Sequence, residues 1–96
     1  MTYILRKSDK KEKKYMMEMP DDDMIHYFGA TGYEDYTTHK DEDRAKLYRK
    51  RHRKDRINNK HTAGALSWFI LWSAPSIRQG IKNYEKRFNV NVNYEL

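Results

Sequence analysis

The sequence predicts an α+β fold, in which a small antiparallel sheet packs with three helices. Before residue 30, short runs in which apolar and polar residues alternate predict strands. After residue 40, apolar residues spaced three and four apart predict helices. The chain has 96 residues, which is the usual length of one domain. We therefore expect a single domain over residues 1–96.

An N-terminal meander of three antiparallel strands is expected over residues 1–28. Residues 3–7 and 14–19 have the two-residue apolar period of strands, and the polar stretch between them predicts a turn. Pro20 ends the second strand. After an aspartate-rich turn, residues 24–28 predict a third strand, which ends at glycines. Three strands need a covering helix to be stable, so we expect the helices mainly on one face.

A basic helix is expected over residues 41–56. Thr38, with Asp41 three positions later, resembles a capping box. Three consecutive acidic residues beginning at Asp41 suit the positive end of a helix dipole. The apolar stripe of this helix is thin and consists of Ala45, Tyr48 and His52, with Leu47 beside it. Such a helix lies on the surface and exposes most of its circumference to solvent.

A helical hairpin is expected over residues 62–88. Thr62 can cap a helix that extends to about Trp72, and Pro75 prevents this helix from continuing much further. Ser76 precedes a second helix, whose apolar residues fall on one side: Ile77, Ile81, Tyr84 and Phe88.

Residues 89–96 predict a C-terminal strand or tail. Val90, Val92 and Tyr94 alternate with asparagines, which is a strand pattern. This strand could close onto the N-terminal sheet as a fourth strand, or it could pair at an edge with the sheet of a partner.

The residue patterns of metal and catalytic sites are missing from the sequence. The chain has no cysteine, which excludes disulfides and cysteine-based zinc sites and favours a reducing, intracellular origin. The four histidines are far apart, and none has a metal-binding helical spacing. No motif pairs a nucleophile with a base. We therefore expect no metal, no cofactor, no small-molecule substrate and no enzymatic activity.

Two features bear on location. Charge follows too soon after Met1 for a signal peptide, so we expect no secretion signal. The longest charge-free stretch, residues 61–77, is too short to span a bilayer, for which about 20 mostly apolar residues are needed. We expect an intracellular protein without a membrane span.

Charge is distributed unevenly along the chain, whose net charge is +6. Residues 18–43 contain nine acidic residues and one basic residue, a net charge of −8. Residues 44–60 contain nine basic residues and one acidic residue, a net charge of +8. Either these segments neutralise each other within the fold, or the basic segment faces an anionic partner.

The basic segment is the first candidate site. Like charges one helical turn apart repel, and phosphate is a natural counter-charge for arginine. The predicted phosphate-binding residues are Arg44, Arg49, Lys50, Arg51, Arg53, Lys54 and Arg56. The alternatives are neutralisation by residues 18–43 or by solvent, and a nuclear-localisation signal.

The aromatic segment is the second candidate site. Residues 66–72 are apolar almost throughout, and a helix that is apolar on all sides must be covered on all sides. This helix either forms the core of the domain or contacts another subunit through Trp68, Phe69 and Trp72, since tryptophan is frequent in interfaces. With Val90, Val92 and Tyr94, these are the predicted protein-interface residues.

Several segments also carry a family resemblance. They are the run from Phe28 to Asp41, Tyr48–His52, Thr62–Gly64, Trp68–Trp72 and Pro75–Ile77. In their order and residue identities, these segments resemble a family of small proteins encoded by giant (nucleocytoplasmic large) DNA viruses of algae and protists. The resemblance implies a viral protein carried in a virion or a virus factory. It implies no activity and assigns no role to any residue.

Two functional hypotheses follow, and a small enzyme is a third and weaker one. The first is a non-enzymatic structural component of a giant-virus particle or assembly, which binds other viral proteins or itself. The second is a nucleic-acid-binding module that contacts the phosphates of DNA or RNA independently of sequence. The two can be distinguished by whether the acidic segment folds against the basic helix, because a neutralised helix offers little to phosphate.

Overall fold

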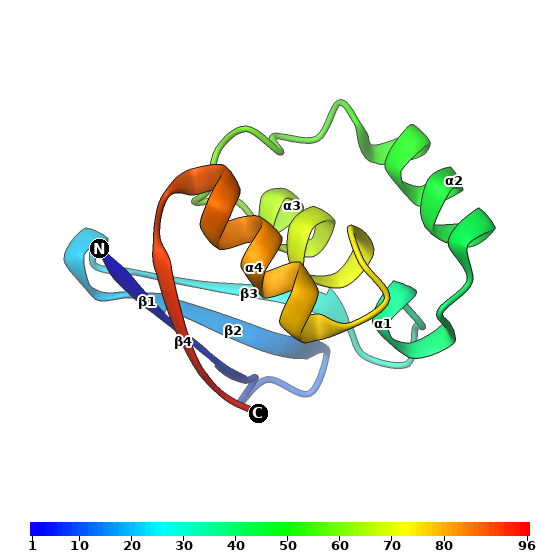
Figure 1. Ribbon diagram of the computed structural model, residues 1–96. Helices are drawn as coiled ribbons and strands as arrows, with labels where there is room; N and C mark the ends of the chain where they lie inside the picture. Colours follow the sequence, from blue (N-terminus) through cyan, green and yellow to red (C-terminus); the bar gives the residue numbers. More distant parts are fainter.

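The computed structural model describes residues 1–96, which form one four-stranded sheet with helices packed against it (Figure 1). The strands are β1 (Thr2–Lys7), β2 (Lys13–Met19), β3 (Met24–Ala30) and β4 (Asn91–Glu95). The α-helices are α1 (Tyr36–His39), α2 (Glu42–His52), α3 (Ala63–Leu66) and α4 (Ile77–Phe88). A 3-10 turn, η1 (Pro20–Asp22), separates β2 from β3, and a π-helical segment, η2 (Ser67–Trp72), continues α3.

The sheet has the order β3-β2-β1-β4 and contains one parallel pair. The antiparallel meander of β1, β2 and β3 confirms the prediction for the N-terminal third. β4 closes onto this sheet as a fourth strand, but it runs parallel to β1, from Thr2 opposite Asn91 to Arg6 opposite Glu95. The prediction of a purely antiparallel sheet is therefore wrong for this strand. α4 returns the chain to the end of the sheet where β1 begins, and a strand that enters there runs in the direction of β1.

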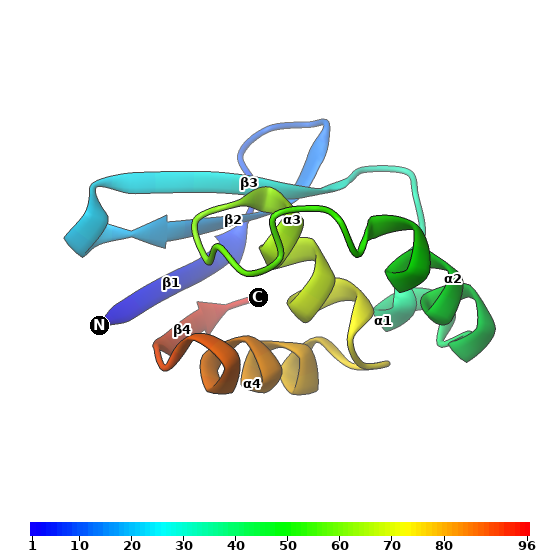
Figure 2. The same ribbon diagram turned by 90° about the horizontal axis from the view of Figure 1, so that it is seen from above.

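The helices cover one face of the sheet. In Figure 2 the strands of the meander lie along one side of the molecule, α4 lies along the other, and α3 lies between them. α2 stands at the end of the molecule, away from the sheet. This arrangement confirms the predicted α+β fold, although the helices are more numerous than expected.

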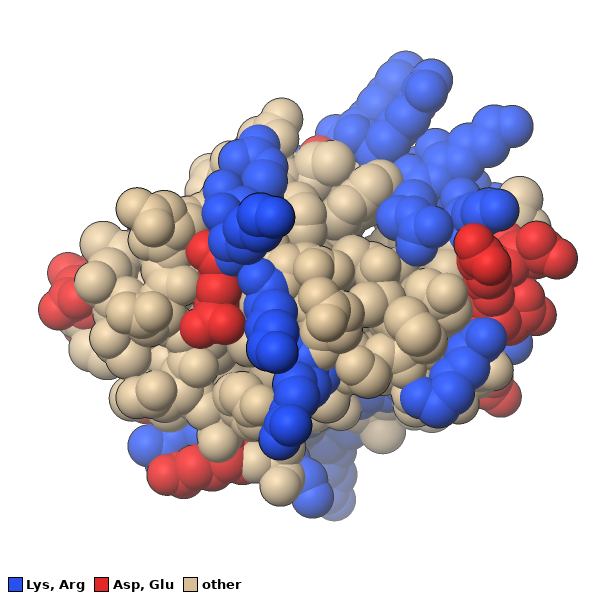
Figure 3. All heavy atoms as spheres, viewed as in Figure 1, with Lys and Arg blue, Asp and Glu red and all other residues tan.

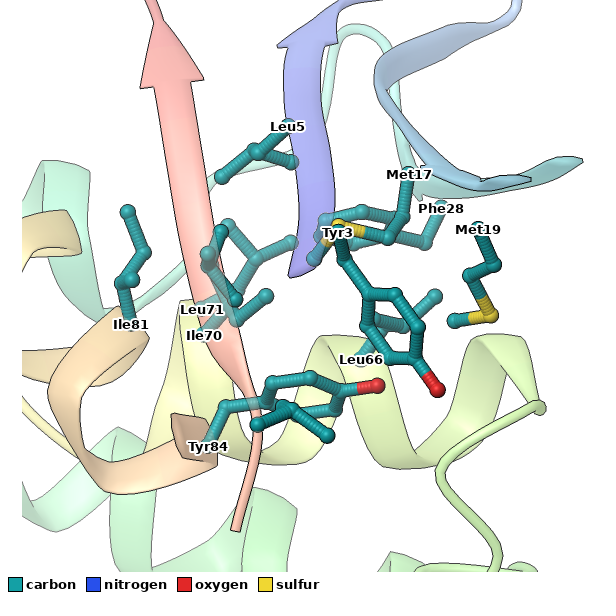
Figure 4. Close-up of a cluster of buried hydrophobic side chains, with 12 residues drawn as sticks. Tyr3, Leu5, Met17, Met19, Phe28, Leu66, Ile70, Leu71, Ile81 and Tyr84 are labelled. Atoms are coloured by element: carbon teal, nitrogen blue, oxygen red, sulfur yellow. The ribbon is translucent and has the colours of Figure 1, made fainter. Parts of the chain in front are cut away.

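The core lies between the sheet and the helices (Figure 4). Strand residues two apart point toward the helices, because alternate side chains lie on one face of a strand. The residues that meet there are Tyr3, Leu5, Met17, Met19 and Phe28 from the strands, and Leu66, Ile70, Leu71, Ile81 and Tyr84 from the helices. Both tyrosine hydroxyls have acceptors, since Tyr3 donates to Asp22 (3.1 Å) and Tyr84 to the Lys60 carbonyl (2.8 Å).

The start of the basic helix differs from the predicted capping box. Asp35 caps α1, and it exchanges reciprocal hydrogen bonds with Thr38 in a capping box of that short helix. Asp41 caps α2 by itself, because its Oδ1 accepts hydrogen bonds from the backbone N–H groups of Asp43 (3.0 Å) and Arg44 (3.2 Å). The extra helix arises because two capping residues six positions apart each begin one.

α2 also ends earlier than the predicted residue 56. Its last residue is His52, whose Nδ1 lies 2.9 Å from the Asp55 carboxylate, and the Asp55 N–H donates to the His52 carbonyl (2.9 Å). This turn replaces the next helical turn. Arg53, Lys54 and Arg56 therefore lie in turns beyond the helix.

The caps predicted for the helical hairpin are confirmed. Thr62 Oγ1 accepts from Ala65 N (3.1 Å), and Ser76 Oγ accepts from Gln79 N (3.1 Å). α4 packs against η2 so closely that a Cβ atom at Gly80 would lie 2.2 Å from the Ile70 carbonyl oxygen. Glycine is therefore required where these two backbones meet.

Candidate functional site

α2 is attached to the rest of the molecule by one narrow side. Ala45 is buried, and the Tyr48 ring stacks on Trp72 with centroids 4.1 Å apart and an interplanar angle of 3°. Arg49 Nη1 donates to the Trp72 carbonyl at 2.6 Å. The stripe predicted for this helix thus faces η2, and most of the remaining circumference is exposed.

Two of the seven predicted phosphate-binding residues are engaged within the fold. Arg44 pairs with Glu34 at 3.3 Å, but both side chains remain more than half exposed. Arg49 is half-buried and makes the hydrogen bond to η2. The other five are exposed and form no ion pair: Lys50, Arg51, Arg53, Lys54 and Arg56.

No acidic residue of segment 18–43 pairs with the cations at residues 50–56. Three of the nine are engaged on the sheet side, and four lie at or beside the N-terminal end of α2: Glu34, Asp41, Glu42 and Asp43. Asp35 is buried and pairs with Lys14 of β2 at 2.9 Å. Glu18 pairs with Arg6 across the sheet at 3.3 Å, and Asp22 accepts the Tyr3 hydroxyl. Figure 3 shows acidic side chains at one end of α2 and lysine and arginine side chains toward its other end. The acidic segment therefore leaves the basic end of α2 without counter-charge.

A hollow beside α2 combines cationic and aromatic side chains. It has a volume of about 300 Å³, and we call it the α2 hollow, defined by its lining residues Arg44, Leu47, Tyr48, Arg51, His52 and Trp72. Three of its rings form one stack, since the centroid of Tyr48 lies 4.1 Å from those of both His52 and Trp72. Burial, followed by the charge of Asp55, raises the pKa of Tyr48 to about 12, so its ring is neutral at physiological pH.

A second cleft, of about 340 Å³, lies on the sheet side of the same stack. Its polar lining includes the Lys14–Asp35 pair, the His52–Asp55 pair and Ser67. Asp35 is already bound by Lys14 and by the backbone N–H of Thr37. The carboxylate is thus committed to the capping of α1 and to its lysine partner.

The predicted interface residues occupy different environments. Val90 and Val92 are buried, 6% and 7% exposed, and belong to the core. Of the two alternatives for this segment, the structure has the first: β4, which contains Val92, pairs with β1 of its own sheet, and Val90 packs into the core just before it. Tyr94, by contrast, is exposed.

The predicted aromatic residues are partly exposed. Phe69 and Trp72 pack against the core cluster, and Phe69 meets Phe88 edge-on at 5.4 Å. The Trp68 ring lies 6.5 Å from that of Tyr48. The segment therefore serves first as the central layer between the sheet, α2 and α4.

A basic ridge on α4 was not predicted. Arg78, Lys82 and Lys86 follow one another at intervals of four residues, are exposed and form no ion pair. Figure 3 shows a band of basic side chains that runs along α4. The sequence contained the signal, a four-residue basic period within the predicted helix. The α2 hollow was also missed, since its residues come from two distant segments.

Two classes of structure are absent from the chain. No group of three or more histidine, aspartate or glutamate side chains is arranged to hold a metal ion. No helix has the length and apolar character needed to cross a membrane.

Comparison with known proteins yields one family and no functional relative. No curated protein and no solved structure matches the chain. Residues 3–52, which run from β1 to the end of α2, match a family of unknown function, DUF5754. The matched residues do not include α3, η2, α4 and β4, which complete the core. The chain, with half of its length matched, belongs to the DUF5754 family.

Proposed function

We propose that this protein binds nucleic acid without enzymatic activity, and that the basic end of α2 holds the phosphates. The observation that carries the proposal is the set of five exposed cationic side chains between residues 50 and 56 that have no carboxylate partner. Like charges this close repel by a few tenths of a kcal/mol per pair. A phosphate backbone supplies the missing counter-charge and releases its own counterions on binding.

The kind of contact follows from the side chains. Three of the five are arginines, and the planar guanidinium fits two phosphate oxygens at once. Arg49 is anchored to η2 and holds the helix in place. No element of the chain has a recognised motif that reads base edges in a groove, so we expect binding to be independent of sequence and steeply dependent on salt.

Titration with DNA at low and high salt tests the proposal, with two variants of equal charge. Arg53→Ala/Lys54→Ala/Arg56→Ala removes three cations beyond α2, where the substitutions leave the helix intact. Arg78→Ala/Lys82→Ala/Lys86→Ala removes three from α4. We expect the first variant to lose at least about tenfold in affinity and to have a salt slope lower by about 2 to 3. The second variant should lose less affinity.

Two outcomes would contradict the proposal. Absence of binding by the unmodified protein at low salt would exclude nucleic acid as the partner. Equal losses in the two triple variants would show that overall charge, rather than the end of α2, is responsible.

We also propose a structural role in a viral assembly as a second function, compatible with the first. The resemblance to giant-virus proteins supports it, and so does β3, an edge strand with no acidic, lysine or arginine residue and with Ile25 54% exposed. Edges without charge are prone to pair with another chain. Concentration-dependent association in light scattering that Ile25→Lys abolishes would support this role, whereas a strict monomer that is absent from purified virions would contradict it.

A further inference from the structure

The α2 hollow offers a surface that suits more than phosphate. Arg44 and Arg51 are seven residues apart, which places them on the same side of α2 two turns from each other. Leu47 lies between them and is 49% exposed, so its apolar side chain is accessible beside the two arginines. The hollow therefore presents an apolar patch flanked by two cations.

The aromatic side of the hollow is held in place before any ligand arrives. Trp72 is fixed by packing against the core and by the hydrogen bond from Arg49 to its carbonyl. The Tyr48 ring lies nearly parallel to Trp72, and the His52 ring is tilted 20° from that of Tyr48. A rigid surface of this kind loses little conformational entropy when a flat ring packs on it.

The cations of the hollow are available to a ligand. Arg51 has no ion-pair partner. In the Arg44–Glu34 pair both side chains are exposed, so a phosphate can replace Glu34 as the partner of Arg44. A molecule that fits must join a flat, apolar ring to negative charge within a few ångströms. A nucleotide unit has this composition.

We infer that the α2 hollow receives an unpaired nucleobase, so that the preferred partner is a single strand rather than a duplex. The inference rests on the proposed nucleic-acid binding and specifies its substrate. In a duplex the base faces are stacked inside the helix, whereas a single strand exposes them to aromatic side chains while its backbone follows a basic groove. Arg44 and Arg51 would hold the phosphates on either side of the base, and Arg53, Lys54 and Arg56 the phosphates beyond.

Three probes separate the base from the phosphate. A short oligothymidylate, a duplex of the same length and inorganic polyphosphate are titrated at one salt concentration. Both tryptophans lie beside Tyr48, so their fluorescence reports the hollow. We expect the single strand to bind about tenfold more tightly than the duplex and to quench this fluorescence, and polyphosphate to bind without quenching.

Substitutions on the exposed side of α2 test whether the preference for a single strand arises in the α2 hollow. Leu47→Ser removes the apolar patch from a half-exposed position, so the fold is kept. We expect it to lower affinity for the single strand about fivefold and to leave the duplex unchanged. Lys50→Ala, in which an exposed cation outside the hollow is removed, serves as the control and should lower both affinities by the same factor.

The outcomes distinguish this inference from the function on which it rests. Equal affinity for single strand and duplex, or equal effects of Leu47→Ser on both, would overturn the inference and leave the proposed function standing. Failure of all three probes to bind at low salt would overturn both.

Discussion

At the scale of single residues, Glu34 is the one carboxylate that forms an ion pair with a predicted phosphate-binding residue. Its pair with Arg44 is exposed, and such pairs contribute only about 0–1 kcal/mol to stability. We therefore expect Glu34→Gln to keep the fold and to raise nucleic-acid affinity about threefold at low salt, because it frees a cation and removes a repelling charge. Glu12→Gln, which removes an exposed carboxylate from the β1–β2 turn, is the control. An equal rise in both variants would show that only net charge matters.

Gly80 tests the contact between α4 and η2. An added Cβ would meet the backbone oxygen of Ile70 at 2.2 Å, and backbone cannot move aside as a flexible side chain can. We expect Gly80→Ala to lower the free energy of unfolding by about 3 kcal/mol, measured by urea denaturation. At Gly64 a Cβ would first meet the Asp55 side chain at 3.3 Å, so Gly64→Ala should cost much less. A Gly80→Ala variant as stable as Gly64→Ala would show that the two backbones are further apart.

At the scale of elements, the sequence was informative wherever structure is decided locally. Thr62 and Ser76 begin helices because each side chain caps the backbone three residues later. The strands of the meander were found from their two-residue period. The end of α2 could not be predicted from the sequence, because it depends on the turn between His52 and Asp55. The direction of β4 was also inaccessible, since it depends on where α4 returns the chain.

Removal of β4 and the valine that precedes it should strongly destabilise the fold. Val90 and Val92 are buried in the core, and Glu85 of α4 accepts the Val92 N–H at 2.9 Å. Truncation after Asn89 would expose Tyr3 and Leu5 of β1, so we expect the cooperative unfolding transition to be lost. Truncation after Tyr94 removes only exposed residues and should be tolerated. A shortened chain that still unfolds cooperatively would contradict the role of β4 in the core.

At the scale of the whole molecule, the candidate site combines a basic segment that can be predicted from the sequence with an aromatic stack that cannot. The basic residues are consecutive and could be found by inspection. Tyr48 and Trp72 are 24 positions apart, and no local pattern indicates that their rings stack. The partners of the acidic segment could not be predicted for the same reason, because Asp35 meets Lys14 only when the sheet has formed. Charge composition thus predicted a polyanion partner, while the aromatic surface beside it required the fold.

Two buried core tyrosines, Tyr3 and Tyr84, and the partly buried Tyr48 make the stability of the whole molecule sensitive to alkaline pH. Burial is the main cause that raises the pKa values of Tyr3 and Tyr48 to about 12, and it raises the pKa of Tyr84 as well. In the unfolded chain tyrosine ionises near pH 10. The folded state thus disfavours the phenolate, and its stabilisation is complete below about pH 10 and is lost as the pH rises toward about 12. Tyr3 and Tyr48 each contribute at most about 3 kcal/mol to this loss.

Thermal melts followed by circular dichroism between pH 8 and pH 12 should therefore show a melting temperature that falls steeply only above about pH 10. Tyr48→Phe keeps the ring and removes the ionisable hydroxyl, so the fall should become shallower. Tyr33→Phe changes a tyrosine that is 74% exposed and should leave the fall as it is. If both variants followed the unmodified protein, ionisation of Tyr48 would not be coupled to folding. The stack that joins α2 to η2 would then be looser than its 4.1 Å ring separation indicates.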